Sequence, residues 1–267
     1  MKAFELFNEW PCPTVVAAVI DRDGVSHGYG DGDQRLPLAS VTKLLTAAAV
    51  HLAIEEGTIA VGDELDAHGG TTYDLLGHAS GLAPGGERVD EPGRRRIYSN
   101  AGYERLASAL EQRADMTFAE YLEEGIFDPL GMRSTELLGS PAHGVQSTAN
   151  DLVRFLDGIG GLLAASTIDT MTTPYLPELI GVLPGYGRQS PNTWGLGPEI
   201  RHNKSPHWTG ATNHPRTWGH FGATGTFLWV DPVAATSMIV LTDRDFGQWA
   251  IPRWTAVSDA VLDELAD

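Results

Sequence analysis

The chain is poor in basic side chains, and lysine is the scarcest of them. Its 267 residues include 35 acidic and 18 basic ones, which gives a formal net charge of −17. Only Lys2, Lys43 and Lys204 are lysines. An acidic protein repels nucleic-acid phosphates and anionic lipid headgroups, so we expect neither nucleic acids nor membrane surfaces as partners. The charge favours solubility and says nothing about the fold.

Cysteine and long apolar stretches are scarce as well. Cys12 is the single cysteine, so no disulfide can form within the chain. No window approaches the roughly 18 apolar residues of a membrane span, and Glu5 and Glu9 interrupt the region where a signal peptide would be apolar. These features predict a cytoplasmic protein without a membrane segment, in which Cys12 has a structural role.

Strand patterns lie at the two ends of the chain. Residues 14–21 read as a buried strand, and Asp23-Gly24 predicts a hairpin turn into a second strand. Three further strands are expected near the C-terminus, at 217–222, 224–231 and 235–242.

Helical patterns fill the middle of the chain, from about 37 to 175, and an amphipathic helix beginning near Pro252 ends it. The segment 180–217, rich in Gly, Pro, Trp and Asn, is expected to be a long surface loop. This order predicts an α/β (α+β) protein with one antiparallel sheet that is built from both termini and flanked by helices. We expect residues 1–36 and 190–267 to form the sheet region and 37–189 an inserted, mainly helical region, together one domain. A cleft between them is a usual place for a site.

The predicted helix from 40 to 56 is the most informative segment. It is apolar nearly all round and should be buried, yet it carries Lys43. Burial lowers the pKa of a lysine, whereas an arginine could not give up its proton near neutral pH. Ser40 lies one helical turn before Lys43, so the side chains are neighbours. Such a pair can activate a hydroxyl nucleophile without histidine, although a capping serine and a solvated lysine would give the same spacing.

Two further motifs follow in order, Tyr98-Ser99-Asn100 and His220-Phe221-Gly222. With Ser40-Val41-Thr42-Lys43, they resemble the three motifs of the serine β-lactamase and penicillin-binding-protein superfamily. The Tyr-x-Asn form is similar to the branch of class C β-lactamases, D-alanyl-D-alanine peptidases and family VIII esterases. The segments 75–82, 127–132 and 146–152 are also typical of that branch, so the resemblance runs from about residue 13 to the end. It implies the β-lactamase-like fold.

The resemblance also implies site roles. Ser40 would be the acylated nucleophile, Lys43 would share its proton, and Tyr98 would be the general base, with a phenol made more acidic by neighbouring cations. Asn100 would hydrogen-bond Lys43 and the substrate. The backbone N–H groups of Ser40 and Ala223 would form the oxyanion hole, and Gly222 would allow close backbone approach. No metal or other cofactor is expected.

The third motif departs from the Lys-Thr-Gly form. His220 replaces a permanent cation, and Phe221 removes a hydroxyl that helps relatives acting on β-lactams to hold the substrate carboxylate. Both changes weaken the case for efficient turnover of penicillins or cephalosporins and are compatible with an esterase. We therefore expect a serine hydrolase that acts through an acyl-enzyme on small carboxylic esters or amides. The alternatives are a β-lactamase or D-alanyl-D-alanine carboxypeptidase, and a penicillin-binding-like module that binds without hydrolysis. The oligomeric state stays open.

Competing patterns are weaker. Gly24-Val25-Ser26-His27-Gly28 matches a nucleophile elbow, but a hairpin turn precedes it and no helix can follow. The nine histidines are irregularly spaced, which disfavours zinc. Arg94-Arg95-Arg96 is expected to be a solvated loop or a cationic rim of the cleft.

The tryptophans cluster near the C-terminus. Trp229 and Trp254 are predicted core residues. Trp194, Trp208 and Trp218 are candidates for the wall of an apolar acyl pocket.

Overall fold

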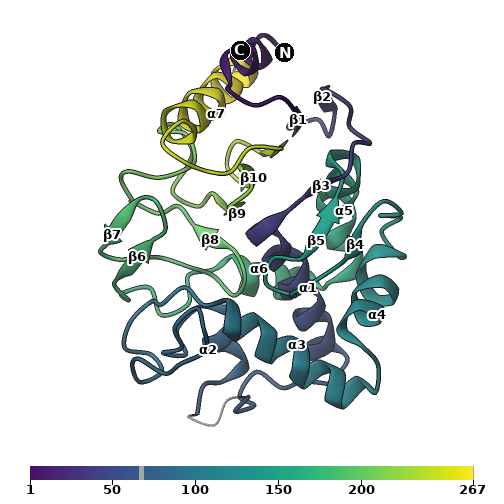
Figure 1. Cartoon of the computed structure of the whole chain (residues 1–267), viewed down its shortest axis with the longest axis vertical. Coiled ribbons are helices and arrows are strands. Elements are labelled where there is room, and N and C mark those ends of the chain that lie inside the picture. The colour runs from purple at the N-terminus through teal and green to yellow at the C-terminus, as the bar shows by residue number, and fades with distance from the viewer. Residues whose placement is uncertain (66–68, 267) are drawn as a thin grey trace.

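The computed structural model describes residues 1–65 and 69–266 and contains a six-stranded sheet built from both ends of the chain (Figure 1). Every neighbouring pair in this sheet is antiparallel, as predicted. Strand β1 pairs with β11, so the N-terminal strand lies beside the last one. In sheet order, the strands are β2 (Ser26–Tyr29), β1 (Val15–Ile20), β11 (Thr236–Thr242), β10 (Thr226–Asp231), β9 (Trp218–Gly222) and β8 (Glu199–Ile200).

Both faces of the sheet are covered, which explains why its central strands are apolar throughout. Successive side chains of a strand point to opposite faces. On β10, Leu228 belongs to the core shared with the helical region, whereas Phe227 and Trp229 belong to the core beneath the C-terminal helix. The sheet therefore separates two hydrophobic clusters, and a site between sheet and helices lies on the Leu228 side.

The helical region is built around α1, which is buried on nearly every side. Helix α3 packs against it, and α5 packs against the sheet. The helices are α1 (Thr42–Glu55), α2 (Thr72–Leu76), α3 (Asn100–Ala114), α4 (Phe118–Leu122), α5 (Ala149–Leu162), α6 (Ala165–Thr172) and α7 (Ala250–Ala266), with the short turns η2 (Ala39–Val41) and η3 (Glu123–Phe127).

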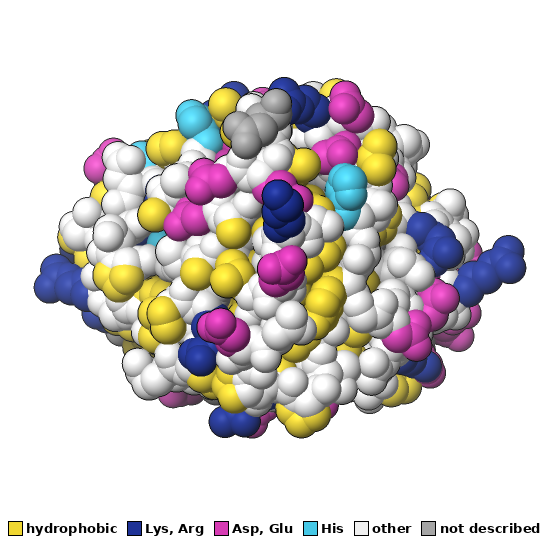
Figure 2. Space-filling view, turned by 90° about the horizontal axis from the view of Figure 1, so that it is seen from above, with side chains coloured by type: hydrophobic (Ala, Val, Ile, Leu, Met, Phe, Trp, Pro, Cys, Tyr) yellow, Lys and Arg dark blue, Asp and Glu magenta, His cyan; other side chains and the backbone are white. Residues whose placement is uncertain are grey.

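The two termini meet on the outer face of the sheet (Figure 1). A 3₁₀ helix, η1 (Lys2–Glu9), begins the chain. The backbone N–H groups of Lys2 and Ala3 donate to the Glu264 carboxylate of α7, at 2.9 and 2.8 Å. On the face seen in Figure 2, acidic and basic side chains alternate, and neither sign gathers into a patch. Among the described residues, each helix is too short or too polar to cross a bilayer.

The expectation of a surface loop at 180–217 is wrong. This segment forms the hairpin of β6 (Gly181–Leu183) and β7 (Gly187–Gln189) and the edge strand β8. Most of residues 192–200 are buried. Trp194 and Trp208 enter the interior, and the buried Glu199 pairs with Lys204 and His207. A third sheet, β3 (Leu36–Pro37), β5 (Val145–Ser147) and β4 (Glu136–Leu137), lies within the helical region.

Candidate active site

Ser40 lies in η2, two residues before α1 begins at Thr42, so the helix starts later than the sequence suggested. The turn between β9 and β10 holds the preceding residues: the Thr224 hydroxyl donates to Pro37 O at 2.9 Å, and the Thr226 hydroxyl donates to Leu38 O at 3.0 Å. Ala39 has a φ of +45°, a conformation that is costly for a residue with a side chain. Ser40 is thus fixed against the sheet while half-exposed.

Gly222 is what allows this close approach. A Cβ at this position would lie 2.5 Å from both Leu38 O and Thr226 Oγ1. The end of β9 can therefore touch residues 37–40, the nucleophile loop, only while residue 222 has no side chain.

Tyr98 meets Ser40 directly. Its hydroxyl donates to Ser40 Oγ at 2.7 Å, and its ring packs against His78, with 4.6 Å between ring centroids, and against Trp194. The expectation of a more acidic phenol is wrong. Burial raises the pKa of Tyr98, the nearby Glu199 raises it further, and the Ser40 hydrogen bond only partly opposes them. Tyr98 is therefore a neutral hydrogen-bond donor in the free protein.

Lys43 is fully buried, as predicted, one turn after Ser40. Its ammonium group donates to Asn100 Oδ1 and to Ala142 O, each at 2.8 Å, and lies 4.7 Å from the centre of the Tyr98 ring. The expected bond from Lys43 to Asn100 is thus confirmed. Burial lowers the pKa of Lys43 to about 7. This amine can therefore exist in its neutral form at physiological pH.

His220 is buried on the same face of the sheet as Leu228, its cross-strand partner. Its Nδ1 lies 2.7 Å from Phe221 O, so this nitrogen carries the proton and donates. Burial, reinforced by the nearby Lys43, lowers the pKa of His220 to about 3. The third motif therefore presents a neutral imidazole.

Phe221 points away from the site. It lies opposite Phe227 in the β9–β10 register and packs among Tyr186, Trp208 and Trp254 in the core beneath α7. Its substitution for a hydroxyl residue therefore serves packing on the far side of the sheet.

The three consecutive arginines separate into different roles. Arg95 pairs with Asp90 on the surface at 2.5 Å, whereas Arg96 is buried and donates to the carbonyls of Gly77, Tyr175, Leu176 and Asn192. Arg96 therefore belongs neither to a solvated loop nor to a cationic rim. It ties the Tyr98 segment to three distant parts of the chain.

Some of the predictions for the tryptophans are confirmed and one is wrong. Trp229 and Trp254 are fully buried, as predicted. Trp194 reaches the site, packing on His78 and on His220. Trp208 lies in the core beneath α7, which excludes it from a pocket beside Ser40.

A buried cluster behind Trp194 was missed in the sequence. The Glu199 carboxylate pairs with the Lys204 ammonium, accepts from His207 Nε2 at 3.0 Å and accepts from Trp208 Nε1 at 2.5 Å. Lys204 also donates to Thr193 O at 2.8 Å. Burial by itself would raise the pKa of Glu199, but Lys204 and His207 lower it to about 2. The scarcity of lysine was a signal for Lys204, but Glu199 lies in a strand of only two residues, too short to show a sequence period.

His78 was also missed as a contact of the site. It is buried against Tyr98, Tyr103 and Trp194, and its Nδ1 accepts from the backbone N–H of Ser99. It belongs to the segment 75–82 that resembles the family, but no spacing in the sequence linked it to Tyr98.

The competing motifs do not form sites. Ser26 begins the exposed edge strand β2, which does not lead into a helix. Within residues 1–65 and 69–266, no three His, Cys, Asp or Glu side chains converge as metal ligands would. Burial raises the pKa of the Cys12 thiol to about 11, so the thiolate is disfavoured.

The Beta-lactamase family model matches residues 8–262, and the chain belongs to this family, whose members are serine hydrolases. A β-lactamase from Mycobacterium bovis is 46% identical, with a TM-score of 0.96 over 98% of this chain and 99% of that one. A hydrolase with promiscuous acyltransferase activity shares the fold, with a TM-score of 0.79 at 18% identity over 97% of this chain and 96% of its own.

A putative D-alanyl-D-alanine carboxypeptidase from Salmonella paratyphi B is 28% identical over 209 residues. The match covers 61% of this chain and 48% of that relative. The chain thus spans about half the length of the curated relatives it matches.

Proposed function

We propose that this protein is a serine hydrolase that forms an acyl-enzyme on Ser40, with small carboxylic esters or amides as substrates. The observation that carries the proposal is the 2.7 Å hydrogen bond between Tyr98 and Ser40, beside a buried lysine one helical turn away. The half-exposed nucleophile thereby lies beside a proton donor, and a buried amine of suitable pKa lies 4.7 Å from the centre of the donor's ring.

Lys43 is the group that takes up the Ser40 proton. Its pKa of about 7 matches this task, whereas the raised pKa of Tyr98 keeps the phenol protonated. As Ser40 Oγ attacks the carbonyl carbon, the Ser40 proton passes to the neutral Lys43 amine. The leaving alcohol or amine then receives a proton from Tyr98, and the Lys43 ammonium returns the Ser40 proton to Tyr98, so both groups are neutral again. Water attacks the acyl-enzyme by the same steps, which restores Ser40 and releases the acid.

The backbone N–H groups of Ser40 and Ala223 are the proposed oxyanion donors. The contact that Gly222 permits brings the β9–β10 turn against the nucleophile loop, which supports their convergence. An oxyanion donor of this kind contributes about 3 kcal/mol to the transition state.

Esters are favoured over carboxylate-bearing substrates because the third motif carries no charge. His220 is neutral, and Phe221 faces the opposite core. A D-alanyl peptide or a β-lactam would bring a carboxylate without a cation from this motif. The similarity to the Mycobacterium bovis β-lactamase and to the putative carboxypeptidase nevertheless makes β-lactamase or carboxypeptidase activity the second candidate.

The test compares wild type with Ser40→Ala on a nitrophenyl acetate ester, a chromogenic cephalosporin and a D-alanyl-D-alanine peptide. We expect Ser40-dependent turnover of the ester that exceeds turnover of the other two. Faster cephalosporin or peptide turnover would support the second candidate. Binding of these compounds without turnover would mean a non-hydrolysing module.

A further inference from the structure

An apolar cavity of about 320 Å³ has Tyr98, the residue that hydrogen-bonds Ser40, in its wall. The other lining side chains are mostly apolar: Pro84, Ile97, Ile180, Val182 and Pro184. Val182 is 61% exposed and Ile180 37% exposed, so two aliphatic residues of the β6 region face solvent at this cavity. Exposed aliphatic side chains around a hollow are a mark of a binding site.

The wall formed by β6 is fixed to the Tyr98 segment. The backbone N–H of Arg96 donates to Ile180 O at 3.0 Å, and Arg96 forms an isolated bridge with Gly181. A side chain at position 181 would collide with the Arg96 carbonyl oxygen. The cavity therefore keeps a constant position relative to Tyr98.

The cations at this cavity are already engaged. The Arg96 guanidinium donates to four backbone carbonyls in the interior, and Arg95 pairs with Asp90. A carboxylate placed here would lose water and would have to compete with these partners, whereas a hydrocarbon chain would gain from burial. The charge pattern thus selects an uncharged occupant.

We propose that this cavity is the subsite for an uncharged apolar chain of the ester substrate, with Val182 and Ile180 as specificity-determining residues. This inference rests on the proposed function, because the chain must belong to a substrate attacked by Ser40. The chain can belong to the acyl half or to the alcohol half, and the chemistry that recognises it is the same.

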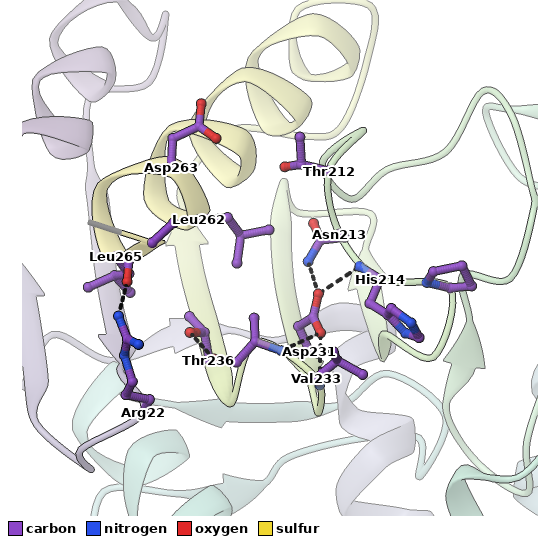
Figure 3. A pocket seen from close by; sticks show the side chains of 13 residues that line it. Arg22, Thr212, Asn213, His214, Asp231, Val233, Thr236, Leu262, Asp263 and Leu265 are labelled. Carbon is purple, nitrogen blue, oxygen red and sulfur yellow. Dashed lines mark hydrogen bonds between the residues drawn. The ribbon is translucent and has the colours of Figure 1, made fainter.

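A larger cavity, of about 540 Å³, lies elsewhere and supplies the control (Figure 3). It surrounds the β10–β11 turn. Leu38, two residues before Ser40, bonds Thr226 at the opposite end of β10, roughly 20 Å away for a six-residue strand. The Asp231 carboxylate there is bonded to backbone N–H groups of His214, Val233 and Ala234. Val233 is 57% exposed, close to the value for Val182.

The first experiment measures binding without turnover. Methyl ketones of four to ten carbons carry a carbonyl but no leaving group, and their affinity is measured by titration calorimetry for wild type, Val182→Asp and Val233→Asp. We expect affinity to rise about fourfold per methylene until the cavity is filled, and we expect Val182→Asp to abolish this rise. Val233→Asp should behave as wild type. The subsite proposal would be overturned if affinity did not depend on chain length, or if Val182→Asp and Val233→Asp had equal effects.

The second experiment distinguishes the two halves of the ester. Ser40-dependent kcat/KM is measured for nitrophenyl esters of growing acyl chain and for acetate esters of growing alcohol chain. If kcat/KM rises with chain length in one of the two series and Val182→Asp removes this rise, the cavity binds the half of the ester that was lengthened in that series. If neither series shows this effect while short esters are still cleaved, the subsite is wrong and the hydrolase proposal stands. If the ketones bind as expected but no ester is cleaved, the hydrolase proposal is the one that fails.

Discussion

At the residue scale, burial sets the chemistry of the site. Lys43 and His220 lie in the same dry region, and burial lowers the pKa of each, to about 7 and about 3. Tyr98 responds in the opposite direction because its charged form is the anion. The sequence predicted a buried Lys43 beside Ser40, because the helix is apolar nearly all round and the two residues are one helical turn apart. It could not predict the direction at Tyr98, since the phenol's surroundings come from segments 20 and 96 positions away in the chain, His78 and Trp194.

The pKa of Lys43 predicts the pH dependence of ester cleavage. Because the neutral amine accepts the Ser40 proton, kcat/KM should rise as pH increases through about 7 and then level off. Lys43→Arg keeps a cation that cannot lose its proton, so we expect a 10²–10⁴-fold loss. The measurement is a pH–rate profile for both proteins. A wild-type profile that is flat between pH 5 and 9 would contradict the role of Lys43.

The same shift predicts a change in stability. The pKa of Lys43 lies below its unfolded value of 10.5, so the unfolded chain binds more protons between about 7 and 10.5. Wild type should therefore gain stability relative to Lys43→Met as pH rises through this window. Thermal unfolding at pH 6.5 and 9.5 measures the effect, and a constant difference in Tm would contradict it.

At the element scale, the order of strands and helices was predictable because hydrophobic patterning and turn residues mark it. The strands at 217–222 and 235–242 and the helix near Pro252 were placed close to their observed positions. The segment 180–217 was not, because its elements are short and a buried carboxylate, Glu199, organises them instead of a hydrophobic period.

Gly222 allows β9 to pack closely against the nucleophile loop. In Gly222→Ala, the new methyl group would press on Leu38 O and Thr226 Oγ1, so the loop must move away from the sheet. We expect a loss of about 1–3 kcal/mol in the free energy of unfolding and a drop of at least tenfold in kcat/KM. Gly28→Ala is the matched control, because a Cβ there meets no atom within 4 Å. Equal effects of the two substitutions would refute the close-approach role.

At the scale of the whole molecule, the sheet unites the two ends of the chain and separates two cores. The antiparallel sheet was predictable from strand patterns at both termini, and the family resemblance supported it. Two features of its assembly were not: the docking of η1 on α7, and the Glu199–Lys204–His207 cluster that holds the segment carrying Trp194. Both depend on hydrogen bonds and ion pairs between separate segments, and the local residue pattern of one segment does not predict its partner.

Removing the Glu199 carboxylate should weaken the whole fold. Glu199→Ala leaves the buried Lys204 ammonium without its partner, which typically costs 3–5 kcal/mol. Because the pKa of Glu199 is lowered to about 2, its contribution is complete above about pH 4.5 and is lost as pH falls toward 2. Denaturant unfolding at pH 7 and pH 3 measures both effects. A Glu199→Ala protein as stable as wild type at pH 7 would contradict this role.

The central claim is that Ser40 becomes acylated, and intact-protein mass spectrometry after rapid acid quenching tests it most directly. Wild type mixed with a nitrophenyl ester should gain the mass of one acyl group, and peptide mapping should place that group on Ser40. Ser26→Ala, which changes the exposed serine of β2, should be acylated as wild type is, whereas Ser40→Ala should gain no mass and lose turnover. Unchanged turnover by Ser40→Ala, or acylation mapped to another residue, would contradict the account.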